Sequence, residues 1–261
     1  IKPAIVLARV RTHLELKQAR DRLKHENLSL EAEVARRMGE NQRIQELSIH
    51  MAARVAETRD PETGSHLLRT EGYVYALARR LQYHPRFSAF LTAPTIELLA
   101  KSAPLHDIGK VGIPDHILLK PGKLTTAEWE VMKTHAKKGS DIIEQAERDG
   151  QRSVEFLTMA KSIAHWHHES WDGSGYPDGL IGEAIPIPAR LMALADVFDA
   201  LISKRVYKEP MPFDAARGVI TAERGSRFDP DVVDAFLASF DEFRAIAERH
   251  SDSEASRTAK L

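Results

Sequence analysis

Apolar residues recur at helical spacing along most of this chain, and the alternation typical of strands is almost absent. The first fifty residues show the pattern most clearly, because they contain no glycine before Gly39 and no proline after Pro3. Leu16, Leu23 and Leu30 lie seven residues apart with charged residues between them. This spacing is typical of a charged helix with a narrow apolar seam. We therefore expect an all-α fold that begins with one long helix.

Two interpretations of the first helix remain open. The seam would suit a parallel coiled coil and thus a homodimer, although Glu26 or Asn27, depending on the register, interrupts it. The alternative is a single solvated linker helix. In both cases we expect this segment to connect or dimerise the protein, and not to carry chemistry.

Capping signals and helix breakers predict the remaining helices. Asp60 is a good N-cap before Pro61, and Thr125 with Glu128 forms a capping box. A long segment rich in glycine and proline, residues 169–188, is expected to be a loop. The helices are expected over about residues 61–81, 94–106 with a kink at Pro104, 125–148, 154–168, 189–203, 213–224 and 231–248.

Composition narrows the classes of function. The chain has 261 residues, a formal net charge of -1, 12 histidines and no cysteine. Without cysteine there is no disulfide and no thiolate metal site, so metal ligands must be nitrogen or oxygen atoms. The balanced charge gives no support for binding a nucleic-acid polymer. No apolar run approaches the roughly 18 residues of a membrane span and no signal peptide is visible, so we expect a cytoplasmic protein without a membrane segment.

The adjacent pair His106-Asp107 is the first indication of a metal site. Side chains one residue apart diverge by about 100° on a regular helix, so both reach one ion most easily where a helix ends. Gly109 is expected to supply the turn at that end. A carboxylate can bridge two metals, and a neutral imidazole supplies one nitrogen. Alone, such a pair is more often structural, so its neighbours decide the interpretation.

Other imidazoles and carboxylates occur where helices should face a core. Burial of such groups is costly unless they are paired or bound to a metal, so several of them together favour a cluster of divalent cations. The set comprises Glu62 and His66, four residues apart on one helix face, His135 within a helix, His167 and His168 at a helix end, and Asp196 after an apolar stretch.

The chain resembles the HD-GYP subgroup of the HD-domain phosphohydrolases. The resemblance covers about residues 45 to 245, and the loop Gly175-Tyr176-Pro177 distinguishes this subgroup from other HD hydrolases. The matching strings are His106-Asp107-Ile108-Gly109-Lys110, Lys120-Pro121-Gly122-Lys123-Leu124, His167-His168-Glu169, Trp171-Asp172-Gly173-Ser174-Gly175-Tyr176-Pro177, Asp196-Val197-Phe198-Asp199-Ala200-Leu201 and Phe228-Asp229-Pro230.

The resemblance implies two or three bound transition metals, most readily iron or manganese, and it assigns the ligands by position. Asp107 would be the bridging carboxylate. Glu62 would hold a third metal, although it would equally balance the dipole of its helix. The implied ligands are Glu62, His66, His106, Asp107, His135, His167, His168 and Asp196.

The resemblance also implies residues that contact the substrate. Lys110 would contact phosphate and assist the chemistry together with Asp107, and Arg205 and Lys208 would hold a second phosphate. Tyr176 would touch the substrate from its loop. The alternatives are solvated charges for the three basic residues and loop packing for Tyr176.

Two further residues lie close to the implied ligands. Asp199, three residues after Asp196, is expected to orient a histidine or lysine. His165 lies two residues before His167 and should face away from it, so we expect a structural role.

The implied function is metal-dependent hydrolysis of cyclic di-GMP to pGpG and then to GMP. One alternative is the same chemistry on cyclic GMP-AMP, and another is a catalytically weak sensor or adaptor that binds the ligand or a diguanylate cyclase. A nucleotide phosphohydrolase acting on mononucleotides or alarmones is a third, which the Gly-Tyr-Pro loop disfavours.

Lys2-Pro3 and the residues after it resemble the end of a response-regulator receiver domain, which implies a sensor kinase as a partner. We thus expect a receiver remnant over residues 1–12, a linker helix or coiled coil over 13–44, a catalytic domain over 45–248 and a flexible tail over 249–261.

Overall fold

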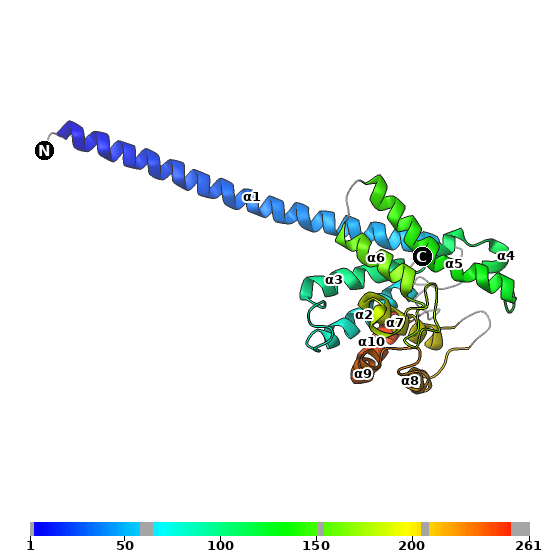
Figure 1. Cartoon of the computed structure of the whole chain (residues 1–261). Helices are drawn as coiled ribbons and strands as arrows, with labels where there is room; N and C mark the ends of the chain where they lie inside the picture. The colour runs from blue at the N-terminus through cyan, green and yellow to red at the C-terminus, as the bar shows by residue number, and fades with distance from the viewer. Residues whose placement is uncertain (1–2, 58–64, 151–153, 205–208, 252–261) are drawn as a thin grey trace. The chain divides into compact units, whose positions relative to one another are not determined.

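The protein is all-α, as expected. A computed structural model describes residues 3–57, 65–150, 154–204 and 209–251 (Figure 1). Within these ranges there is no β-strand, and extended backbone pairs only at isolated bridges between Asp172 and Ile181 and between Arg224 and Phe228. No helix in the described ranges is long and apolar enough to cross a membrane.

The first helix, α1, runs without interruption over Pro3–Glu57. The chain divides into two compact units, residues 1–48 and 49–261, and α1 forms the whole described part of the first unit. Leu16, Leu23 and Leu30 are each about 60% exposed, at 61%, 60% and 62%. Exposed apolar residues at heptad spacing fit either interpretation of this helix, so dimerisation remains an expectation.

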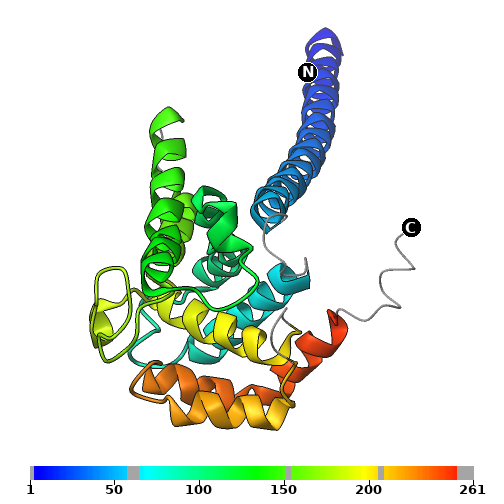
Figure 2. The ribbon, with the colours of Figure 1, turned by 90° about the vertical axis from the view of Figure 1, so that its right-hand side faces the viewer.

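The second unit is a bundle of helices (Figures 1 and 2). Among the residues described, 3-10 turns at Ala103–Leu105, Ile108–Gly112 and Gly182–Ala184 connect longer elements. The α-helices are α2 (Ser65–Leu81), α3 (Ala93–Ser102), α4 (Asp115–Leu118), α5 (Thr126–Asp149), α6 (Glu155–Trp166), α7 (Ile187–Ile202), α8 (Phe213–Ala222), α9 (Pro230–Ala238) and α10 (Phe240–Arg249).

Local signals account for two of the helix ends. The Thr125 hydroxyl accepts from the Glu128 amide while the Glu128 carboxylate accepts from the Thr125 amide, so the expected capping box opens α5. The kink expected at Pro104 is present as a change from α-helix to 3-10 helix after Ser102. The helix is therefore more tightly wound at this proline, directly before the bend at residues 106–107.

The prediction of one helix over residues 231–248 was wrong. Ser239 leaves helical geometry, with φ −115° and ψ 15°, and separates α9 from α10. Phe236 and Phe240 on either side of the break both contact Phe198, with ring centroids 5.3 and 6.4 Å from it. Core contacts therefore set the direction of each segment and override the helix propensity of the sequence.

Helix α7 lies at the centre of the bundle. Its residues from Pro188 to Ala195 are all buried, because the helix packs against α2 and α6 on some sides and against α8 and α9 on others. Figure 2 shows α7 between α6 and the pair α8 and α9. Apart from Arg190, Asp196 and Asp199, the helix is apolar on every side, as is typical of a core helix. Its packing therefore fixes the position of the Asp196 carboxylate.

A buried charge network fixes the long loop before α7. Arg190 on α7 donates through Nε to the Ile185 carbonyl and through Nη1 to Asp229 Oδ2, both at 2.8 Å. Asp229 also caps α9 by accepting from the Asp231 amide at 2.9 Å. The Arg190 guanidinium lies 5.8 Å from the centre of the Trp171 ring, so the same side chain holds both ends of the loop.

Replacing Asp229 with alanine is expected to lower the free energy of unfolding by about 3–5 kcal/mol, because buried Arg190 would lose its carboxylate partner. Urea denaturation measures the change. The matched control is Asp234→Ala, which removes an exposed ion pair with Arg224 and should change stability little. Equal effects of the two substitutions would contradict the importance of the buried network.

Candidate metal centre

Seven side chains predicted as metal ligands come together in two groups. In each group the candidate ligand atoms all lie within 4.8 Å of one another. They come from the first turn of α2, the bend after residue 105, the middle of α5, the end of α6 and the middle of α7. One group is Asp107, His135, His167 and His168, and the other is His66, His106 and Asp196.

Asp107 lies between the two groups. Its Oδ2 is 3.2 Å from His106 Nε2, and its Oδ1 is 3.3 Å from His135 Nε2 and 3.8 Å from His167 Nε2. Each carboxylate oxygen thus faces a different set of imidazoles. This arrangement suits the bridging role that the sequence suggested for Asp107.

Gly109 is required here for a reason other than the expected turn. Its φ is not in the left-handed region, so it does not act as a helix-ending glycine. A Cβ at this position would instead lie 2.0 Å from the His135 carbonyl oxygen and 2.4 Å from the Gly139 amide nitrogen. The missing side chain lets the segment that carries Asp107 approach the helix that carries His135.

Backbone carbonyls set the tautomers of three imidazoles. The Nδ1 atoms of His106, His135 and His167 lie 3.0, 2.8 and 3.0 Å from the carbonyl oxygens of Ala103, Met132 and Ile163. A carbonyl only accepts, so each Nδ1 carries the proton. In the neutral ring, Nε2 then presents its lone pair to the centre, which is the form that ligates metals.

A carboxylate performs the same task for His66. His66 Nδ1 lies 2.8 Å from Asp199 Oδ2, which confirms the expectation that Asp199 orients a histidine. Arg69 holds Asp199 through two bonds, Nε to Oδ1 at 2.6 Å and Nη2 to Oδ2 at 2.9 Å. The arginine and the histidine together hold the pKa of Asp199 well below its ordinary value, although burial acts in the opposite direction. No motif or spacing pattern had indicated this role of Arg69.

The Nε2 atoms approach one another closely. His66 Nε2 is 3.4 Å from His106 Nε2, and both of these rings carry their proton on Nδ1. His168 Nε2 is 3.0 Å from the unprotonated Nε2 of His135. Within the described part of the chain, Asp107 Oδ1 and His167 Nε2 are buried and lack a hydrogen-bond partner. Lone pairs gathered in this way repel one another unless a proton or a cation lies between them. The donor set therefore fits divalent cations, one group on each side of Asp107.

The charges of the centre favour neutral rings at His167 and His168 beside an ionised Asp107, and they favour the protonated ring at His106. Burial and the neighbouring imidazoles lower the pKa of His167 to about 3. Burial, together with the imidazoles of His167 and His135, also lowers the pKa of His168 well below its ordinary value. Burial would raise the pKa of Asp107, but Lys110 and His106 outweigh it and hold that pKa well below its usual range. At His106, burial alone would lower the pKa, but the carboxylates of Asp107 and Asp196 outweigh burial and raise it.

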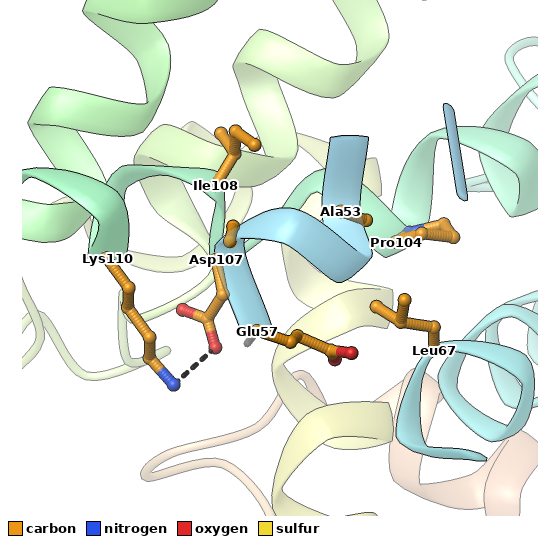
Figure 3. Close-up of a pocket in the computed structure, with 8 residues that line it drawn as sticks. Ala53, Glu57, Leu67, Pro104, Asp107, Ile108 and Lys110 are labelled. Atoms are coloured by element: carbon orange, nitrogen blue, oxygen red, sulfur yellow. Dashed lines mark ion pairs between the residues drawn. The ribbon is translucent and has the colours of Figure 1, made fainter. Parts of the chain in front are cut away.

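Lys110 stands at the edge of the centre. Its Nζ lies 2.8 Å from Asp107 Oδ2, and Figure 3 shows the two side chains meeting beside a small pocket that Glu57 and Leu67 also line. The ammonium group thus lies beside the carboxylate at the middle of the two groups, and its contact with phosphate stays a prediction.

The ring of Tyr176 packs on the same centre. Its centroid lies 4.8 Å from that of His168 and 6.5 Å from that of His135. Burial and the charges of Asp107 and Asp196 raise the pKa of Tyr176 above its ordinary value, so the hydroxyl keeps its proton and is a hydrogen-bond donor. Loop packing and substrate contact, the two interpretations of this residue, are compatible with this placement.

Glu169 fastens the loop that carries Tyr176, a role that the sequence analysis missed. Its buried carboxylate accepts from the amides of Asp178 and Gly179 through Oε1, at 2.8 and 3.1 Å, and from the amide of Leu180 through Oε2, at 3.0 Å. The only signal in the sequence was the position of this glutamate, directly after His167-His168 and directly before a loop rich in glycine. The backbone of the loop is therefore bound to the side chain of Glu169, three residues after the end of α6.

His165 supports the same loop, as its expected structural role requires. Its Nδ1 lies 2.6 Å from the Ser140 hydroxyl and its Nε2 3.2 Å from Asp178 Oδ2. Trp166 donates to the same Asp178 oxygen at 2.8 Å. Three other predicted site residues, Glu62, Arg205 and Lys208, lie outside the described residues.

Comparison with known proteins places this geometry among relatives. The family model of the HD domain matches residues 50–232. A probable cyclic di-GMP phosphodiesterase of Vibrio cholerae serotype O1 is 52% identical over 250 residues, which are 96% of this chain and 57% of that protein. The cyclic di-GMP phosphodiesterase response regulator RpfG of Xanthomonas campestris pv. campestris is 39% identical over 255 residues, 98% of this chain and 64% of that protein. The chain thus spans between half and two thirds of these relatives.

A solved structure shares the fold. The crystal structure of a cyclic GMP-AMP specific phosphodiesterase of V. cholerae aligns with this chain with a TM-score of 0.51 and 20% sequence identity. The alignment covers 83% of this chain and 53% of the chain in that crystal structure. At this level of identity the likeness supports the helical architecture described above.

Substituting Glu169 by alanine is expected to leave three partly buried amides without their carboxylate acceptor and to lower the free energy of unfolding by about 1–3 kcal/mol. Hydrogen exchange of the amides of residues 178–180 should become faster. Glu169→Gln keeps the acceptor Oε1 and should have a smaller effect, while Glu155→Ala, an exposed change on α6, serves as the control. Unchanged exchange in Glu169→Ala would show that the loop is held elsewhere.

The stability of chelator-treated protein is expected to fall as the pH decreases from about 6.5 towards 3. The folded chain takes up a proton on His167 only near pH 3, whereas the unfolded chain does so near the ordinary value of 6.5, so acid favours unfolding. One such group contributes a slope of about 1.4 kcal/mol per pH unit. Denaturation at several pH values should give a shallower slope for His167→Asn, and identical slopes would contradict the buried neutral state.

Proposed function

The chain belongs to the HD domain family and to its HD-GYP group, and we propose that it is a metal-dependent phosphodiesterase that hydrolyses cyclic di-GMP. The observation that carries the proposal is the convergence of five imidazoles and two carboxylates on two adjoining groups around Asp107. The two relatives reported above are described as cyclic di-GMP phosphodiesterases.

We propose that each group holds a divalent cation, with iron or manganese the best match. Nitrogen and carboxylate donors together suit these metals better than magnesium, which prefers oxygen ligands alone. Bound there, the cations would supply Lewis-acid chemistry, making water a stronger nucleophile and neutralising charge on a phosphoryl group. Glu62 is proposed to contribute to a third cation, and this would favour a second cut that yields GMP.

The chain's own residues would orient the phosphodiester. The Lys110 ammonium, 2.8 Å from Asp107, would stabilise the charge that develops on the non-bridging oxygens of a phosphodiester bound at the centre. Tyr176 keeps a hydroxyl proton to donate, and its loop is fixed from two sides by Glu169 and Asp178. Arg205 and Lys208 are proposed to bind the second phosphate of the ring, because they follow the helix that carries Asp196.

The same centre would also suit the alternative substrate cyclic GMP-AMP. The solved structure that shares the fold comes from a protein specific for that molecule. The two cyclic dinucleotides differ in one base, and their phosphodiesters are alike, so the residues of the metal centre do not discriminate between them. We therefore propose cyclic di-GMP on the strength of the more similar relatives.

We propose that the complete protein is a response regulator that works as a dimer and answers to a sensor kinase. The relative aligned over 98% of this chain is a response regulator. The exposed leucines of α1 offer a seam for a second copy of the helix. We also propose a diguanylate cyclase as a partner, because such an enzyme makes the cyclic di-GMP that this protein would hydrolyse.

The test is turnover by protein purified without oxygen and loaded with iron or manganese. Cyclic di-GMP and cyclic GMP-AMP are incubated in parallel, and chromatography identifies pGpG and GMP. The expected result is faster hydrolysis of cyclic di-GMP. His106→Ala combined with Asp107→Ala should lower turnover more than about 100-fold, since loss of an outer-shell partner alone typically costs 10–100-fold.

The matched control is Asp115→Ala combined with His116→Ala, the same residue types on the exposed face of α4. This variant should retain full turnover. Full activity of the His106 and Asp107 double variant would contradict the proposed centre. Binding of cyclic di-GMP by the metal-loaded protein without hydrolysis would favour the sensor or adaptor interpretation.

A further inference from the structure

An exposed tryptophan lies beside the metal centre. Trp129 is on the first turn of α5 and is 45% exposed, whereas most phenylalanines of the bundle are buried. A large ring held in water contributes little to folding, and exposed aromatic rings are often used in binding. The contacts of this ring therefore indicate whether it has a role in binding.

Trp129 continues a row of rings that starts at the imidazoles. Its centroid lies 6.2 Å from that of Tyr176 at an interplanar angle of 84°, and Tyr176 in turn lies 4.8 Å from His168. The edge-on contact between Trp129 and Tyr176 covers only part of the indole, in agreement with its exposure. A flat group placed there would be next to the proposed position of the phosphodiester.

Positive charge accompanies this row of rings. Lys133, one helical turn after Trp129, has its Nζ 5.8 Å from the centroid of Tyr176, and it pairs with Glu130 at 2.9 Å. Lys110 lies at the other end of the row, beside Asp107. Aromatic faces combined with lysines suit a ligand that has both a flat base and phosphate groups, that is, a nucleotide.

We infer that Trp129, supported by Tyr176, stacks against one purine base of the substrate while its phosphodiester lies at the metal centre. The inference rests on the proposed function and deepens it, because it names a residue for base recognition at the same site. The metal centre grips a phosphodiester of any kind, whereas the indole adds affinity only for substrates that carry a base.

The test compares two substrates on the metal-loaded protein. Cyclic di-GMP has purine bases, and its abasic analogue keeps the cyclic ribose-phosphate ring and both phosphodiesters but has no aromatic group. Stacking on an aromatic ring typically contributes about 1–3 kcal/mol per base, or roughly 5- to 150-fold. We expect Trp129→Ala to raise KM for cyclic di-GMP about tenfold with little change in kcat, and to leave turnover of the abasic analogue within about twofold of wild type.

Two variants serve as controls. Trp129→Phe keeps an aromatic face and should restore most of the affinity for cyclic di-GMP. Ile142→Ala removes a similarly exposed apolar side chain, 41% accessible, from the same helix and should change neither substrate's kinetics. These controls separate stacking from a general effect on α5.

Fluorescence gives a second readout that does not depend on turnover. The chain has three tryptophans, and GMP added to metal-loaded wild-type protein should quench part of their emission. In Trp129→Phe that quenching should disappear. GMP contains one base and one phosphate and is not a phosphodiester, so it reports on the contact alone.

Three outcomes overturn the inference. An equal loss of activity on both substrates in Trp129→Ala would show that the tryptophan acts through the structure of the centre. Unchanged KM for cyclic di-GMP would exclude stacking, as would GMP quenching that persists in Trp129→Phe. Failure of the wild-type protein to hydrolyse cyclic di-GMP would overturn the proposed function, yet quenching by GMP that is lost in Trp129→Phe would still support the stacking contact.

Discussion

The fold depends on an electrostatic constraint at its centre. Four imidazoles have their Nδ1 protons committed to fixed acceptors, three to backbone carbonyls and one to Asp199, so their Nε2 lone pairs face one another. The approach of 3.4 Å between His66 and His106 brings two such atoms together. This arrangement is unfavourable without a positive charge between the rings, and it is what makes the bundle suited to divalent cations.

The surrounding structure holds these side chains in place against their mutual repulsion. A central apolar helix fixes the depth of Asp196, and the absence of a side chain at Gly109 brings Asp107 next to α5. The loop before α7 is fastened by Glu169 at one end and by Arg190 with Asp229 at the other. Each of these contacts lies outside the two ligand groups, and each limits how the groups are able to relax.

Much of this was predictable from local patterns. The capping box at Thr125 and the apolar spacing indicated the helices, and the residue types at positions such as 66, 135 and 196 indicated the metal centre. What the sequence could not supply were contacts set by tertiary packing. The break at Ser239 follows from phenylalanines in the core, the need for Gly109 follows from a neighbouring helix, and the part played by Glu169 requires a loop that returns to it. Trp129 carried no recognisable signal for the same reason.

The most direct measurement of the central claim is anomalous diffraction from crystals of the protein loaded with manganese. The account predicts two strong peaks, one in each ligand group on either side of Asp107 and roughly 3.5–4 Å apart. The Nε2 atoms of the imidazoles should point at the peaks. No peak at this centre in fully loaded protein, or manganese bound only at other positions, would contradict it.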